Sequence, residues 1–66
     1  MIEVEFNGSS VSSLATSVAD FVEERSLPRV GVAVAINGSV IPRSEWAVTA
    51  LLHADVIEIV TAAAGG

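Results

Sequence analysis

Apolar and polar residues alternate at the start of the chain. In "MIEVEF", the apolar residues of 2–6 share one face of an extended segment and the glutamates share the other. This period of two predicts a half-buried strand. Asn7-Gly8 follows and predicts a two-residue type I′ hairpin turn, because both central residues of that turn need a positive φ. The return strand, 9–13, is mostly serine, which suits the edge of a sheet.

The apolar spacing changes to that of a helix after this hairpin. The apolar positions lie at i, i+3 and i+4, the stripe of an amphipathic helix, and they are Val18, Phe21 and Val22. We expect about three helical turns. Ser17 is the predicted N-cap, with Thr16 as a rival, because both side chains can accept a hydrogen bond from the first turn. Pro28 disfavours helical geometry at the residue before it, so we expect the helix to end near Ser26.

Strand patterns return in the second half of the chain. "VGVAVAIN", residues 30–37, has apolar residues on both faces, which is typical of a strand inside a sheet. A second Asn-Gly turn then leads into a short strand that ends at Pro42, which has no N–H to donate. Ser44 is expected to cap a short helical turn. "VIEIVT", residues 56–61, is the predicted last strand.

The order of these elements predicts an α+β domain of two layers. We expect a mixed sheet of four or five strands with one main helix on one face, plus a short helical turn. The first hairpin and the helix after it favour a β-grasp (ubiquitin-like) arrangement, in which the last strand pairs parallel to the first. The predicted domain covers residues 1–61, and residues 62–66 are expected to form a flexible C-terminal tail.

Composition and charge narrow the function classes. The 66 residues suffice for one domain, and the absence of cysteine excludes disulfides and thiol chemistry. A formal net charge of −5 argues against nucleic acid and against an anionic membrane surface. No apolar run approaches the ~20 residues of a membrane span. We expect a cytoplasmic protein that is monomeric when free.

The side chains offer little that could do chemistry. His53 lies near Asp55, which would allow a base and its orienting carboxylate, but a solvated loop is the favoured interpretation. A lone histidine makes no metal site, so none is expected. Glu23 and Glu24 are adjacent and point to different helix faces, so we expect a solvated surface. Trp46 could pack in the core or anchor a partner. No intrinsic catalytic residue is predicted.

The chain ends on "TAAAGG", which could be a frayed end or a working one. Glycine has no Cβ, so Gly65 and Gly66, with Ala64 before them, could thread a narrow channel. The α-carboxylate of Gly66 is ionised at pH 7 because its unperturbed pKa is about 3.5. In an enzyme that binds ATP, this carboxylate could attack the α-phosphate and form an acyl-adenylate. With no other reactive group in the chain, the working end is favoured.

Three segments resemble a known family. "AINGSVIPRSEW" at 35–46, "DVIEIV" at 55–60 and the final diglycine are similar to the ThiS family of sulfur carrier proteins in thiamine biosynthesis, which are ubiquitin-like β-grasp proteins. The chain departs from the family at Ala54, where glycine is usual, and in the alanines before the diglycine, where bulkier apolar residues are common.

The resemblance implies a carrier acted on by partner enzymes. A ThiF-like adenylyltransferase would use ATP and Mg²⁺ to adenylate Gly66, and sulfur would displace AMP to give a thiocarboxylate. A ThiG-like thiazole synthase would take that sulfur, and the carrier itself would bind no cofactor. Other possibilities stay open: a carrier for molybdopterin synthase or cysteine synthesis, a ubiquitin-like protein modifier, or a binding module with an inert tail.

One sheet face is a candidate for docking partners. If Val30, Val32, Val34 and Ile36 face the helix, the opposite face carries a set of mostly apolar residues. They are Ala33, Ala35, Val56, Glu58 and Val60. The ordinary exposed apolar surface of a small domain is the competing interpretation.

Overall fold

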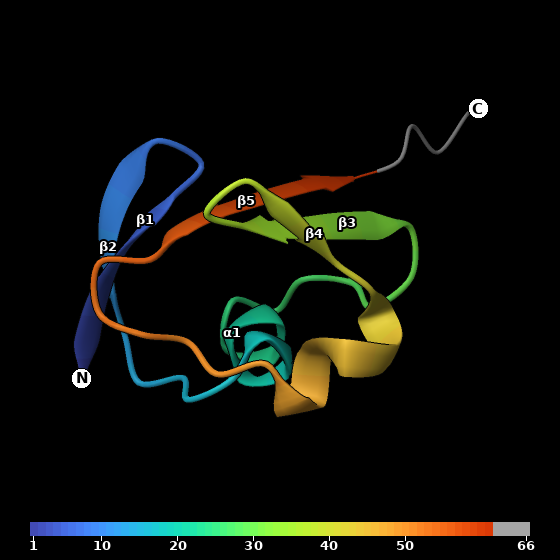
Figure 1. Ribbon diagram of the computed structural model, residues 1–66, viewed down its shortest axis with the longest axis horizontal. Coiled ribbons are helices and arrows are strands. Elements are labelled where there is room, and N and C mark those ends of the chain that lie inside the picture. Colours follow the sequence, from blue (N-terminus) through green and yellow to red (C-terminus); the bar gives the residue numbers. More distant parts are fainter. Residues whose placement is uncertain (62–66) are drawn as a thin grey trace.

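In the computed structural model, which describes residues 1–61, five strands form one mixed sheet with an α-helix across one face (Figure 1). The elements are β1 (Ile2–Phe6), β2 (Ser9–Ser13), α1 (Val18–Glu24), β3 (Val32–Ile36), β4 (Ser39–Ile41), the 3₁₀ helix η1 (Arg43–Val48) and β5 (Val56–Thr61). The strand order is β2-β1-β5-β3-β4. β1 and β5 are parallel, and the other neighbours are antiparallel. The predicted α+β architecture, with the last strand parallel to the first, is confirmed.

Two hairpin turns set the register of the outer strands. Asn7 and Gly8 have φ of 48° and 87°, and Asn37 and Gly38 have φ of 51° and 86°. Positive φ at both central residues is what a type I′ turn requires, so both predicted turns are confirmed. The turns place β2 and β4 at the two edges of the sheet.

Helix α1 begins as predicted but is shorter than expected. The Ser17 hydroxyl accepts a hydrogen bond from the Asp20 N–H at 3.1 Å, which makes Ser17 the N-cap. Thr16, the rival cap, instead donates to the Asp20 carboxylate at 2.8 Å. The helix has seven residues and ends at Glu24, so the expectation of about three turns was wrong.

The early end of α1 has a local cause. Ser26 adopts a left-handed conformation with φ of 56°. Its N–H donates to Glu23 O at 3.0 Å, and the N–H of Leu27 donates to Val22 O at 2.9 Å. This pair of bonds is a Schellman motif, which satisfies the last helical carbonyls and turns the chain away. The motif ends the helix before Pro28 could do so.

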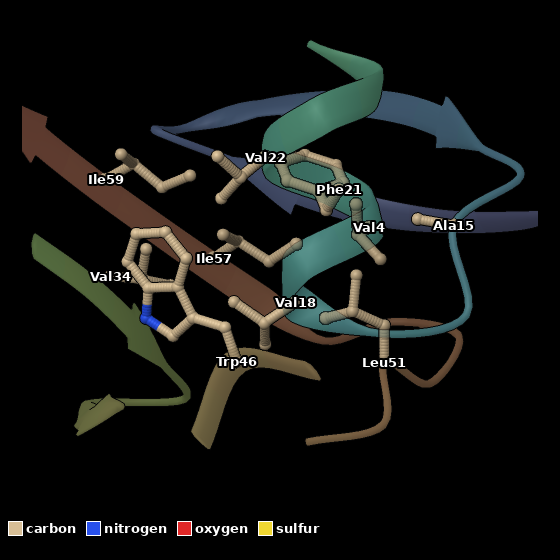
Figure 2. Packing of buried hydrophobic residues seen from close by; sticks show 10 residues of the cluster. All are labelled: Val4, Ala15, Val18, Phe21, Val22, Val34, Trp46, Leu51, Ile57 and Ile59. Carbon is tan, nitrogen blue, oxygen red and sulfur yellow. The ribbon is translucent and has the colours of Figure 1, made fainter. Parts of the chain in front are cut away.

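The core lies between the sheet and the helical layer. Ten buried apolar residues form it: Val4, Ala15, Val18, Phe21, Val22, Val34, Trp46, Leu51, Ile57 and Ile59 (Figure 2). All three predicted stripe residues of α1 are among them. Phe6 packs edge-on against Phe21, with ring centroids 5.3 Å apart.

Trp46 belongs to this core. Its side chain is 4% exposed, and its indole N–H donates to the Ile41 carbonyl at 2.9 Å. Figure 2 shows the ring between Val34 and Val18, close to β3. The question whether Trp46 packs inside or anchors a partner is therefore resolved in favour of packing.

Two details of the second half differ from expectation. β3 begins at Val32, and Val30 is 74% exposed, so Val30 precedes the strand and is not part of the buried face of the sheet. Gly31 has φ of 80°, which interrupts the extended backbone between them. Ser44 is not a cap either, because η1 follows Pro42 and has no side-chain cap. The Glu45 N–H donates to Pro42 O at 2.8 Å instead.

Candidate functional site

The predicted reactive end of the chain follows β5, the middle strand of the sheet, in the sequence. Ala64, Gly65 and Gly66 lie outside the residues that the structure describes, so their predicted roles stay predictions. The preceding strand, β5, ends at Thr61 and lies between β1 and β3. Thr61 is in register with Val32, the first residue of β3. The contacts that hold β5, and the residues around its end, therefore position the predicted site.

Asn7 binds the backbone of β5 beyond the end of β1. The β1–β5 ladder reaches Phe6 and Ile57. The side chain of Asn7 then continues the pairing, because its Oδ1 accepts from Ile59 N at 2.9 Å and its Nδ2 donates to Ile59 O at 3.1 Å. One side-chain amide thus replaces the next residue that a longer β1 would have supplied.

Asn37 holds the start of β5 from the other side. Its Oδ1 accepts from Val56 N at 2.9 Å, and its Nδ2 donates to the Asp55 carboxylate at 3.0 Å. The same carboxylate accepts from Leu52 N at 2.9 Å and so orders the preceding turn. Sequence reasoning assigned both asparagines to turns alone, since no local pattern reveals partners 19 and 52 residues away.

Four of the five predicted docking residues lie together on the sheet face opposite α1. Ala33 is in register with Val60, and Ala35 with Glu58. They line a shallow groove of about 300 Å³, which we call the sheet groove. Its remaining lining residues are Asn7, Val34 and Val40. Whether a partner docks there stays a prediction.

Val56 and Val40 change the outline of that surface. Val56 lies in a separate depression with Glu3, Glu5 and His53, so the structure does not group it with the other four. Val40 was not anticipated, although it pairs with Ala35 in the β3–β4 register and is 72% exposed. In the sequence, the position of Val40 in the short strand after the second Asn-Gly turn is the one feature that could have placed it on this surface.

Charge divides this sheet face into two halves. The β1 side carries Glu3 and Glu5, and the hydroxyls of Ser10 and Ser12 donate to Glu3 at 3.4 and 3.3 Å. The sheet groove on the β3 side is apolar apart from Glu58 on β5 and Asn7 in the first turn. Such a face is complementary to a partner surface with cations next to an apolar patch.

His53 is engaged in structure rather than paired with Asp55. Its Nδ1 accepts a hydrogen bond from the Glu3 N–H at 3.1 Å. The next residue, Ala54, donates its N–H to Glu3 O at 2.7 Å, so this loop pairs with β1. The hydrogen bonds of Asp55 go to Asn37 and Leu52, and no base with an orienting carboxylate forms.

Among residues 1–61 no three His, Cys, Asp or Glu side chains come together in a group that could hold a metal ion. Over the same residues, no helix has the length and apolar character needed to cross a membrane.

One carboxylate has a shifted pKa. The buried hydroxyl of Ser13 donates to Glu24 at 2.7 Å, and the Leu14 N–H donates to its second oxygen at 2.8 Å. These two bonds, the hydroxyl first, stabilise the ionised form and lower the pKa of Glu24 below its ordinary value of 4.5. Glu23 pairs with Arg29 at 2.9 Å. Both acids are exposed, as expected, but each has a specific partner.

Fold and site together define a class of protein. A mixed five-stranded sheet, with β1 and β5 parallel at its centre and a helix packed across it, is a β-grasp domain of the ubiquitin-like class. Residues 2–66 match the model of the ThiS family, and the chain belongs to this family. Membership supports a sulfur carrier in thiamine biosynthesis, a small protein that is not itself catalytic.

The solved structures give an independent comparison of the fold. The chain is similar to the crystal structure of a thiamine biosynthesis protein, ThiS, from Geobacter metallireducens. The TM-score is 0.84 at 20% identity, over 98% of this chain and 100% of the other. A search of the curated proteins found no match.

Proposed function

We propose that the chain is a sulfur carrier of thiamine biosynthesis whose Gly66 carboxylate is converted to a thiocarboxylate. The observation that carries the proposal is the ThiS family match, which extends over residues 2–66 and so includes the terminal diglycine. The fold supports it, because β5, the strand that precedes the diglycine in the sequence, lies in the middle of the sheet.

The chemistry needs the Gly66 carboxylate to be activated, its acyl carbon to take up sulfur, and a sulfur–sulfur bond to be reduced. In a ThiF-like adenylyltransferase, which supplies Mg²⁺, a carboxylate oxygen of Gly66 attacks the α-phosphorus of ATP and pyrophosphate leaves. The terminal sulfur of a persulfide then attacks the acyl carbon and AMP leaves, which gives an acyl disulfide. A thiol attacks the other sulfur of that disulfide, which forms a new disulfide and releases the thiocarboxylate of Gly66. A ThiG-like thiazole synthase takes the sulfur, and the carboxylate returns.

The chain's own residues present the carboxylate in this scheme. Gly66 is the acceptor, and Gly65 and Ala64 are the slim residues that pass through the partners' channels. Ala33, Ala35, Glu58 and Val60 of the sheet groove, with Val56 beside it, are the proposed docking surface. ATP and Mg²⁺ belong to the partner. We place the carrier in the cytoplasm, as a monomer when free.

Intact mass spectrometry tests the proposal. The full chain is incubated with a ThiF-like enzyme, ATP, Mg²⁺ and a persulfide donor. One oxygen should be replaced by sulfur, and fragmentation should locate the change on Gly66. A chain that lacks Gly66 is the matched control and should stay unmodified. An unchanged mass of the full chain, or an equal change in the control, would contradict the proposal.

A genetic test separates the thiamine pathway from the alternatives. Deletion of the carrier should create a growth requirement that thiazole or thiamine relieves. Loss of molybdoenzyme activity or a requirement for cysteine would assign it to another sulfur pathway. A ladder of high-mass conjugates that depends on Gly66 would identify a protein modifier.

A further inference from the structure

A second groove lies on the helical side of the molecule, away from the sheet groove. It has a volume of about 420 Å³ and lies between α1, η1 and the segment before β3. We call it the arginine groove. Ala19, Val22, Trp46 and Ala47 form its apolar part, and Arg29, Val30 and Arg43 complete its lining. Nothing in the proposed sulfur chemistry uses it.

The charge of this groove is opposite to that of the rest of the molecule. The chain has three arginines and no lysine against eight acidic residues, and two of the three arginines line this groove. The third, Arg25, lies over the rings of Phe6 and Phe21 at 5.8 and 5.4 Å. Most of the molecule's positive charge is therefore placed beside one apolar cavity.

The two guanidinium groups keep donors for a ligand. Among the described residues, Arg29 bonds Glu23 at 2.9 Å, and Arg43 donates to the Arg29 carbonyl at 3.2 Å. Each guanidinium has five N–H donors, so most of these donors are not used by these contacts. The Arg29–Glu23 pair is solvent-exposed, with side-chain exposures of 68% and 72%, and such pairs exchange partners at little cost.

Val30 is the large exposed apolar side chain at the groove, and the smaller Ala47 is exposed as well. Val30 is 74% exposed, whereas Val32 two residues later packs against the core. Val32 is in register with Thr61 at the end of β5. The groove therefore opens at the same end of the sheet from which the chain continues toward Gly66, and Figure 1 shows η1 and the segment before β3 at that end.

We propose that the arginine groove is a docking surface for a partner protein segment that carries a carboxylate beside an apolar side chain. The carboxylate pairs with Arg29 and Arg43, and the apolar side chain packs on the exposed side chains of Val30 and Ala47, with the buried Trp46 supporting them from the core. Guanidinium groups suit this task because they bind carboxylates in a two-pronged geometry. The identity of the partner as an enzyme that receives Gly66 rests on the proposed function. The chemistry of the groove is independent of that function.

A peptide titration followed by NMR tests the groove directly. The ¹⁵N-labelled full chain is titrated with an acetylated, amidated Leu-Asp-Leu peptide. The amides of Val30 and Ala47 should shift, and the same peptide with Asn or Lys in the middle should shift them less at equal concentration. Arg29→Gln and Arg43→Gln should each weaken binding by about two- to fivefold, the range for an exposed ion pair.

Two further variants sharpen this test. Glu23→Gln removes the carboxylate that competes for Arg29, so it should tighten binding of the acidic peptide. Val30→Ser should weaken binding, whereas Val40→Ser, at a side chain of nearly equal exposure on the sheet groove, should not. Three results would overturn the proposal: unchanged spectra at a large excess of peptide, equal shifts with the Asp and Asn peptides, or shifts confined to the sheet groove.

The enzymatic step separates this inference from the proposed function. If both hold, the Arg29→Gln/Arg43→Gln double variant should have a raised KM and an unchanged kcat with the partner that uses this groove. If every variant and the unmodified chain fail to gain sulfur, the proposed function fails. If all gain sulfur with equal KM at each partner, only the inference fails.

Discussion

Within residues 1–61, four residues other than glycine hold a left-handed backbone: Asn7, Ser26, Asn37 and Ala54, with φ between 48° and 74°. Asparagine tolerates this conformation well, so the two turn positions carry little strain. Ser26 and Ala54 have no such adaptation. At Ala54, φ is 74° at the position where the ThiS family usually has glycine, so the backbone keeps the shape that glycine would favour.

Replacement of Ala54 by glycine should therefore stabilise the domain. Relief of the left-handed strain outweighs the added entropy of the unfolded chain, by about 1 kcal/mol. For a domain of this size the melting temperature should rise by roughly 4–8 °C. Thermal unfolding by circular dichroism measures it. Ala19→Gly, inside α1, is the control of opposite sign and should lower the melting temperature; a lower value for Ala54→Gly would contradict the argument.

At the scale of elements, β5 depends on the two turn asparagines as well as on its ladders. Asn7→Gly keeps a turn-compatible residue but leaves the Ile59 N–H without its acceptor. Ile59 is 7% exposed, so the loss should cost about 1–2 kcal/mol. Hydrogen exchange should accelerate most at the Ile59 amide.

Asn37→Gly is the matched control for this prediction. This variant removes the same side chain from the same type of turn. The Oδ1 of Asn37, however, accepts from the N–H of Val56, which is 36% exposed. The stability loss should be smaller, with faster exchange at Val56 rather than at Ile59. Equal exchange at both amides in the two variants would mean that the asparagines act only through their turns.

The connection between β2 and α1 depends on the ionised form of Glu24. The pKa of Glu24 is lowered in the folded protein, so its stabilising contribution is present above its ordinary pKa of 4.5 and is lost as pH falls through the lower, folded value. Glu24→Gln should cost less than about 1 kcal/mol at pH 7, because the carboxylate is exposed and screened. The difference in the free energy of unfolding between the unmodified protein and Glu24→Gln should fall toward zero as the pH is lowered.

Urea unfolding of both proteins at a series of pH values measures this difference. Glu23→Gln removes the same charge one residue earlier without touching Ser13 or Leu14, so it controls for net charge. A Glu24→Gln difference that stays constant as pH falls would contradict the role of the ionised carboxylate.

Sequence reasoning succeeded where the structural cause is local. The period of two placed β1 and β5, the Asn-Gly dipeptides gave both type I′ turns, and the spacing of Val18, Phe21 and Val22 gave the buried face of α1. It also predicted Ala33, Ala35, Glu58 and Val60 on one face. Every second residue of a strand points to the same face of the sheet, and residues paired across neighbouring strands share that face.

It failed where the cause lies elsewhere in the chain or in a weak local preference. Ser26 has no strong left-handed preference, so the Schellman end of α1 was not visible, and Gly31 ended the pattern that included Val30. The bonds of Asn7 to Ile59 and the shared groove of Arg29 and Arg43 exist only after the chain has folded.

At the scale of the whole molecule, the sheet face and the helical side differ in charge. A partner that docks on the sheet groove should depend on Glu58, so Glu58→Lys should slow its association and weaken the salt dependence of the rate. Stopped-flow fluorescence with a ThiF-like enzyme measures this. Glu45→Lys makes the same charge change on η1 and should have a smaller effect. Equal association rates for Glu58→Lys and the unmodified chain with both enzyme partners would count against this docking surface.

The central place of β5 has a mechanical consequence. An enzyme that grips the end of the chain and pulls along the strand loads the hydrogen bonds to β1 and β3 together, because they run across the direction of the pull. If an edge strand were pulled away from its neighbour, its hydrogen bonds would instead break one after another, each under the full load. If the proposed partner enzymes hold the chain by its C-terminus, the central position of β5 would resist that pull, and the two hydrogen bonds between the Asn7 side chain and Ile59 would add resistance close to the end of the strand.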